Sequence, residues 1–154
     1  MCSIKQVRLA TLFVMVTVLL AGAQALAQDS RTFPLQNMGV QPSASGYATL
    51  SNVTLLPTPG WGWYDYGGQL SVTCTGLAPR KSYLIGFPYW GLPWLGVFKT
   101  DHDGVLTISN IPVTWQYSNN DPERQTLYLP VYGQNVRPKG LVLLGSTSGY
   151  FDQF

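Results

Sequence analysis

The most constraining feature of this chain is a two-residue alternation of apolar and polar side chains within short segments. In QLSVTCTGL, Leu70, Val72 and Cys74 alternate with hydroxyl-bearing residues. Successive side chains of a β-strand point to opposite faces, so this pattern is typical of a strand with one buried face. No segment shows a sustained apolar repeat of 3.6 residues, and the sequence therefore predicts no long helix.

Further short runs of this kind are separated by Gly, Pro, Asn and Asp, which is typical of all-β domains. Candidate strands are expected near residues 46–56, 68–75, 82–88, 95–100, 105–112, 126–132 and 140–145. Such a series favours an all-β sandwich or barrel. We expect a single antiparallel Greek-key β-sandwich of about seven strands. Within it, Asp103-Gly104 predicts a tight hairpin in VFKTDHDGVLTIS, because both residues tolerate a positive φ.

The segment TGLAPRKSYLIGF places Leu77, Pro79 and Tyr83 in an L-x-P-x-x-x-Y arrangement. It resembles the tyrosine corner of fibronectin type III and immunoglobulin-like domains, in which the tyrosine hydroxyl bonds back to the backbone of the preceding crossover. In those families the corner lies late in the domain, whereas several expected strands follow it here. A superoxide-dismutase-like Greek-key sandwich without that family's metal-binding histidines fits as well. The resemblance implies an architecture and no activity, because such folds host unrelated functions.

The first 27 residues have the layout of a secretory signal peptide. Lys5 and Arg8 provide a basic start, an apolar run covers residues 9–21, and Ala25-Leu26-Ala27 is a small-x-small cleavage pattern. The run is short for a membrane span of about 20 residues. We therefore expect export to an extracellular, periplasmic or cell-envelope location.

The remaining chain is expected to divide into two parts. Residues 28–43 show little pattern, which predicts an extended N-terminal arm. Residues 44–154 carry the candidate strands and are expected to form the β-sandwich domain. The length from residue 28 onward is that of a single domain.

The charge balance of the exported part argues against nucleic-acid partners. The whole chain carries 9 Lys and Arg against 7 Asp and Glu, and removal of Lys5 and Arg8 leaves 7 of each. Binding to nucleic acid or an anionic surface needs clustered cations. The only adjacent pair after residue 27 is Arg80-Lys81. We therefore expect no nucleic-acid partner.

One cysteine remains after the expected cleavage, because Cys2 lies in the signal. Cys74 alone cannot form an intramolecular disulfide. Its place on the apolar side of the QLSVTCTGL alternation predicts a buried structural thiol rather than a nucleophile.

The sequence offers few groups for catalysis. The single histidine, His102, lies between Asp101 and Asp103 in a tight turn. Consecutive turn residues do not converge on one point, so we interpret His102 as a solvated turn residue rather than a general base. The chain has no G-x-S-x-G elbow and no phosphate-binding glycine motif. We expect that the protein is not an enzyme.

Metal sites are not predicted either. One histidine and one buried cysteine cannot supply a zinc or copper site. Oxygen ligands for calcium could come from Asp101 and Asp103 or from SNNDPE at 118–123, but neither stretch matches an EF-hand loop. We interpret both as polar turns and expect no metal and no cofactor.

Two aromatic segments, GWGWYDYGG at 60–68 and GFPYWGLPWLG at 86–96, are the most distinctive part of the chain. They flank two expected strands and could meet at one end of a hairpin. Three interpretations remain open: burial as a core cap, a docking surface for another protein or a second copy, and a platform for sugars with Asp65 and Gln69 as hydroxyl partners. The candidate binding surface consists of Trp61, Trp63, Tyr64, Tyr66, Tyr89, Trp90 and Trp94.

Taken together, these patterns favour a secreted, non-catalytic structural or accessory subunit of an extracellular or cell-envelope assembly. It would dock through the aromatic loops onto another protein or a second copy of itself. Apolar residues near both ends, such as Phe33 and Phe151, also suggest docking onto this domain or a neighbour. The alternative is a carbohydrate-binding β-sandwich module that uses exposed Trp and Tyr side chains.

Overall fold

The structure, a computed structural model, describes residues 30–56, 63–87, 94–118 and 125–151. Within these ranges the chain forms eight β-strands and no helix. The described part accordingly contains no helix that is long and apolar enough to cross a membrane. The strands are β1 (Arg31–Asn37), β2 (Ser45–Leu56), β3 (Trp63–Thr75), β4 (Ser82–Gly86), β5 (Trp94–Lys99), β6 (Leu106–Ser118), β7 (Thr126–Gly133) and β8 (Gly140–Ser148).

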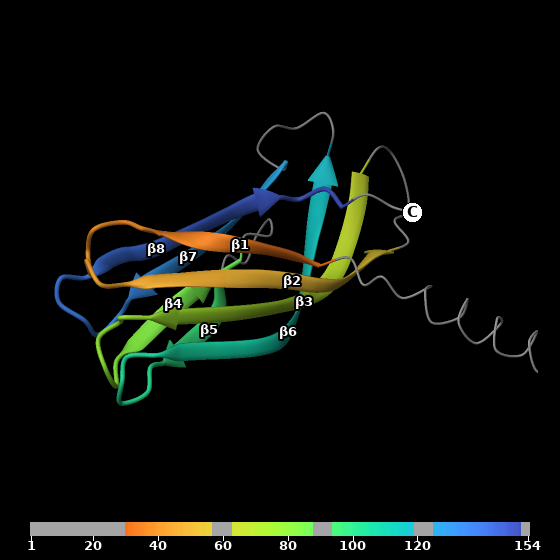
Figure 1. Cartoon of the computed structure of the whole chain (residues 1–154). Coiled ribbons are helices and arrows are strands. Elements are labelled where there is room, and N and C mark those ends of the chain that lie inside the picture. The colour runs from red at the N-terminus through yellow and green to blue at the C-terminus, as the bar shows by residue number, and fades with distance from the viewer. Residues whose placement is uncertain (1–29, 57–62, 88–93, 119–124, 152–154) are drawn as a thin grey trace, which may run out of the picture.

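All eight strands belong to one sheet, in the order β5-β4-β7-β8-β1-β2-β3-β6. Every neighbouring pair is antiparallel. The sheet curls into a nearly closed barrel, with β1, β2, β3 and β6 in one wall and β4, β5, β7 and β8 in the other (Figure 1). The all-β prediction is confirmed. A seven-strand Greek-key sandwich is not confirmed, because the described strands form a single sheet of eight.

The additional strand is β1, which lies inside the segment predicted to be an extended arm. It pairs with β2 on one side and with β8 on the other. Phe33 and Leu35 point into the core and are each 5% exposed. The sequence pattern did not reveal this strand because only these two inward residues mark it, with Pro34 between them. Residues 31–37 are therefore an integral strand of the sheet.

Prolines mark the places where pairing between strands stops. Pro34 lies in β1 just before the residues that pair with β8. Pro130 lies in β7 just before the residues that pair with β4. Pro112 lies in β6, one of the two edge strands. Proline has no N–H to give to a ladder, and each of these prolines occupies a position where one side of its strand is unpaired.

The inward faces of the strands form one apolar core. Leu70, Val72 and Cys74 are all fully buried, as their alternation predicted. Tyr83 is also fully buried, and its hydroxyl accepts a hydrogen bond from the N–H of Ala78 at 2.9 Å. This is the bond back to the preceding crossover that the resemblance to a tyrosine corner implied.

The predicted Asp103-Gly104 turn is present, but it does not join paired strands. The N–H of Asp101 donates to the carbonyl of Val105 at 2.9 Å, and Gly104 has a φ of +77°. A side chain at Gly104 would collide with the carbonyl of Leu77, so glycine is needed there. β5 pairs with β4, whereas β6 pairs with β3. The turn thus connects the two opposite edges of the sheet, and the hairpin prediction is wrong.

Candidate docking surface

A row of apolar side chains crosses the outer side of one barrel wall. Val97 of β5 lies opposite Leu84 of β4, Leu84 lies opposite Tyr132 of β7, and Tyr132 lies opposite Leu141 of β8. These side chains face outward because the neighbouring residues along β4 and β7 are fully buried in the core. The row therefore forms an apolar surface that extends over four strands.

Trp94 extends this surface. Its ring meets the ring of Tyr132 edge-on, with centroids 5.5 Å apart and planes at 76°. Trp94 is still 44% exposed, and Val97 is 53% exposed. Pro130 and Leu144, which lie opposite each other, continue the surface over β7 and β8. We call this set the apolar outer face; it consists of Leu84, Trp94, Val97, Pro130, Tyr132, Leu141 and Leu144.

The opposite wall has a different outer surface. Tyr47 of β2, 51% exposed, lies between Pro34 of β1 and Thr73 of β3. Many of the other outward residues there carry hydroxyl groups, and some bond to each other, as between Oγ1 of Thr32 and Oγ1 of Thr49 at 2.8 Å. We call this set the hydroxyl outer face; it consists of Thr32, Ser45, Tyr47, Thr49, Ser71, Thr73, Thr75 and Thr107.

Buried aromatic side chains fill the barrel at the end where the described chain finishes. The rings of Tyr66 and Trp115 stack with centroids 5.6 Å apart. Phe87 contacts Trp115 edge-on at 6.0 Å, and Phe151 lies 5.6 Å from the same ring. All four residues are 3% exposed or less. This cluster is part of the core, and Phe151 docks onto its own domain.

The structure divides the predicted aromatic binding surface. Tyr66 is 2% exposed and belongs to the core, so it cannot be part of an exposed surface. Trp94 is exposed, but it stands on a strand beside Tyr132 rather than on a loop. The remaining predicted residues, Trp61, Tyr89 and Trp90 together with the side chains of Trp63 and Tyr64, lie outside the described residues.

The charged residues gather at the other end of the barrel. Four connections lie there, at residues 38–44, 76–81, 100–105 and 134–139 (Figure 1). Within or beside them are five of the six described cations: Arg80, Lys81, Lys99, Arg137 and Lys139. The apolar outer face therefore has its cations at one end and none within it.

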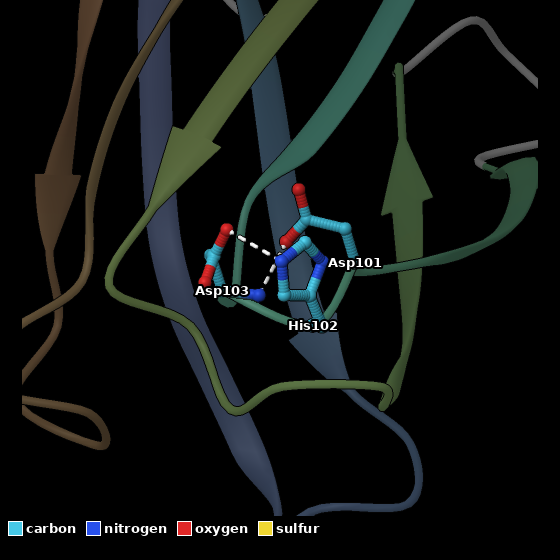
Figure 2. Close-up of side chains that lie close together, drawn as sticks. All are labelled: Asp101, His102 and Asp103. Atoms are coloured by element: carbon cyan, nitrogen blue, oxygen red, sulfur yellow. Dashed lines mark hydrogen bonds and ion pairs between the residues drawn. The ribbon is translucent and has the colours of Figure 1, made fainter.

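The turn at 100–105 holds the one group of metal-ligating side chains found among the described residues, and all three are exposed (Figure 2). Oδ1 of Asp101 accepts hydrogen bonds from the N–H groups of Asp103 and Val105 at 2.9 and 2.8 Å. These bonds, that from Val105 above all, lower the pKa of Asp101. Nε2 of His102 lies 3.1 Å from Oδ2 of Asp103. The Asp101 carboxylate thus organises the turn, and His102 is 71% exposed to solvent.

Cys74 has the environment of a structural thiol. It is fully buried on β3, and this burial raises its pKa to about 12. The thiolate is therefore disfavoured at physiological pH. The prediction of a buried cysteine is confirmed.

Comparison with models of known protein families finds no match for this chain, and comparison with curated protein sequences finds none either.

Most of the apolar outer face was not predicted from the sequence, although the sequence contains a signal for it. The runs YLI at 83–85, LPVY at 129–132 and LVLL at 141–144 are apolar without alternation. A strand that is apolar at successive positions has apolar side chains on both faces. In a barrel wall, the side chains on one face of the strand pack into the core, and those on the other face contact solvent or a partner.

Proposed function

We propose that the protein is a secreted, non-catalytic structural or accessory subunit of an extracellular or cell-envelope assembly, and that it docks through its apolar outer face. The observation that carries this proposal is the exposure of Trp94 and Val97 beside Leu84 and Tyr132 on the outer side of β5, β4 and β7. Contiguous exposed apolar surface on a folded domain is typical of an interaction site.

The composition and setting of this face support the docking role. Tryptophan and tyrosine supply most of the binding energy in many protein interfaces. Here Trp94 and Tyr132 are held by paired strands, so little side-chain freedom remains to be lost on binding. The signal-like segment at residues 1–27 supports an exported subunit.

The docking proposal is tested by isolating the tagged protein from its source under mild conditions, in the wild type and in Val97→Asp. We expect the wild type to migrate as an assembly and Val97→Asp to migrate as a monomer. Tyr47→Asp is the matched control, because Tyr47 is equally exposed but lies on the hydroxyl outer face. A monomeric wild type, or equal loss of assembly in both variants, would overturn the proposal.

A second candidate function is carbohydrate binding, which the hydroxyl outer face favours. Tyr47 stands 51% exposed among uncharged side chains, with Ser45 and Thr49 on the same strand and Thr73 opposite. An aromatic ring can stack on a sugar face while hydroxyl groups bond to it. Isothermal titration with soluble glycans tests this function. Binding that is lost in Tyr47→Ala and retained in Trp94→Ala would support it over docking through the apolar outer face.

The fold is also proposed to be a Greek-key arrangement of the immunoglobulin-like or superoxide-dismutase-like kind. The connections β3–β4 and β6–β7 join strands that are not neighbours in the sheet, which supports this proposal. An experimental structure that shows whether β5 and β6 pair would test it.

A further inference from the structure

The two edges of the sheet differ in their ability to accept another strand. β5 and β6 are the edge strands of the described sheet. β6 carries Pro112, which cannot donate a backbone hydrogen bond, and Asn110 at a φ of +55°. Prolines and irregular backbone are devices that protect an edge from pairing. β6 is therefore poorly suited to pair with a strand of another chain.

β5 lacks most of this protection. It contains no proline and no charged side chain except Lys99 at its last position. Its irregularities are the register shift at Leu95 and a φ of +151° at Gly96, and Gly96–Lys99 still pair one to one with β4. Val97, in the middle of this stretch, is 53% exposed on the outer side. The β5 edge thus offers four consecutive residues in unbroken register beside the most exposed apolar side chain of the apolar outer face.

We propose that two copies of this chain pair through β5 in antiparallel orientation, with Val97 of each copy facing Val97 of the other. This inference rests on the proposed docking function and names the partner as a second copy. The dimer would extend the sheet across the two β5 strands, as in β-strand addition.

The residues of β5 are complementary to themselves in this register. The outward pair at the centre is Val97 with Val97, and β-branched side chains pack well across antiparallel strands. On the inward side, Phe98 lies opposite Gly96, whose missing side chain leaves room for the ring; Phe98 already lies 3.6 Å from the Cβ position of Gly96 in its own chain. Aromatic residues opposite glycine are a known stabilising pair in sheets.

The only charge on β5 also fits this pairing. Lys99 of one copy comes to lie opposite Leu95 of the other, next to the exposed ring of Trp94. The ammonium group can then interact with the indole face, and the two Lys99 groups stay apart at opposite ends of the pair. The twofold axis that relates the two copies also keeps both apolar outer faces on the same side of the extended sheet, where they form one continuous surface.

Cysteine cross-linking at the twofold axis, where the two Val97 residues face each other, tests the proposed register in the full-length protein with Cys2→Ser, which removes the other native cysteine besides Cys74. Facing residues of antiparallel strands have Cα atoms about 4.5–5.5 Å apart, which suits a disulfide. We expect Val97→Cys to form a covalent dimer when oxidised glutathione accepts the two electrons of the paired thiols. Tyr47→Cys is the control, because Tyr47 is 51% exposed and lies on the other wall, and we expect this variant to form no covalent dimer. The native Cys74 is fully buried and does not interfere.

A charge-pair experiment tests the same contact without covalent chemistry. Like charges that face each other across strands oppose pairing, so Val97→Lys and Val97→Asp should each raise the dimer dissociation constant by about tenfold or more. An equimolar mixture of the two should restore the dimer in sedimentation analysis. Both variants alter an exposed position, so folding should be retained.

The outcomes separate this inference from the proposed function. Preferential cross-linking of Val97→Cys and rescue by the mixture would support pairing through β5. If assembly depends on Val97 but neither cross-linking nor rescue occurs, the apolar outer face binds a different partner; pairing of two copies is then wrong and the docking function stands. If the wild type is a monomer whose behaviour does not depend on Val97, both are wrong.

Discussion

Trp115 donates its indole N–H to the carbonyl oxygen of Gly149 at 2.8 Å, and this bond fixes the segment after β8 to the barrel core. Two residues later, Phe151 packs against the rings of both Tyr66 and Trp115 and is 1% exposed. The guanidinium of Arg31 lies 4.3 Å from the centre of the Phe151 ring. The first strand and the last described segment are thus held together at the aromatic end of the barrel.

Phe151→Ala is expected to destabilise the protein strongly, because it removes a fully buried ring that contacts two other rings. Such a truncation costs about 3–5 kcal/mol of unfolding free energy. Urea unfolding followed by tryptophan fluorescence measures the loss. Tyr150→Ala is the neighbouring control; Tyr150 is 40% exposed, and its replacement should cost less than about 1 kcal/mol. Equal losses in the two variants would contradict the core role of Phe151.

Tyr83→Phe tests the hydroxyl that secures the crossover between β3 and β4. This hydroxyl accepts from the N–H of Ala78 and donates to Oε1 of Gln41 at 3.0 Å, and the residue is fully buried. Loss of these bonds should lower the unfolding free energy by about 1–2 kcal/mol. Denaturant unfolding is the measurement, with Tyr47→Phe at an exposed position expected to have almost no effect. An unchanged unfolding free energy in Tyr83→Phe would show that Gln41 alone satisfies the Ala78 N–H.

The alternation of side chains predicted the strands that have one apolar face, because burial of that face requires the pattern. The whole inward series on β3, from Leu70 to Cys74, follows from it. Strand ends were harder to predict. β3 begins at residue 63 and β6 extends to residue 118, well beyond the predicted ranges. These extensions pair with each other, as Tyr66 does with Trp115, and a cross-strand partner cannot be read from local sequence.

Glycine content concealed the first half of β3. The strand was predicted to begin at Gly68, whereas Gly67 and the residues before it are also paired with β6. A Cβ at Gly68 would approach the carbonyl oxygen of Ser51 to 3.2 Å, so the glycine relieves a tight contact between β3 and β2. The candidate docking surface was missed for a related reason. Its residues come from four strands, and only the order of those strands in the sheet brings Val97, Leu84 and Tyr132 together.

The Cys74 thiol is expected to be unreactive in the folded protein. A pKa raised from 9.0 to about 12 lowers the thiolate fraction at pH 8 by about a thousandfold, and burial blocks access as well. With Cys2→Ser in place, a chromogenic disulfide reagent should therefore release no product from the native protein and one equivalent per Cys74 in urea. Tyr47→Cys in the same background provides the positive control, since Tyr47 is 51% exposed. Rapid labelling of native wild type would show that β3 opens readily.

The stability of the 100–105 turn should depend on the ionisation of Asp101. Hydrogen bonds from the backbone, first that of Val105, favour the carboxylate and lower its pKa in the folded state. A lowered folded-state pKa stabilises the protein above the ordinary value of 3.8, and this contribution disappears as the pH falls through the folded-state value. Asp101→Asn retains an acceptor oxygen without the charge. Thermal midpoints measured from about pH 7 to about pH 2 should therefore be higher for the wild type at neutral pH and converge with the variant in acid. A gap between the two curves that stays constant across this range would assign the effect to geometry rather than to the charge of Asp101.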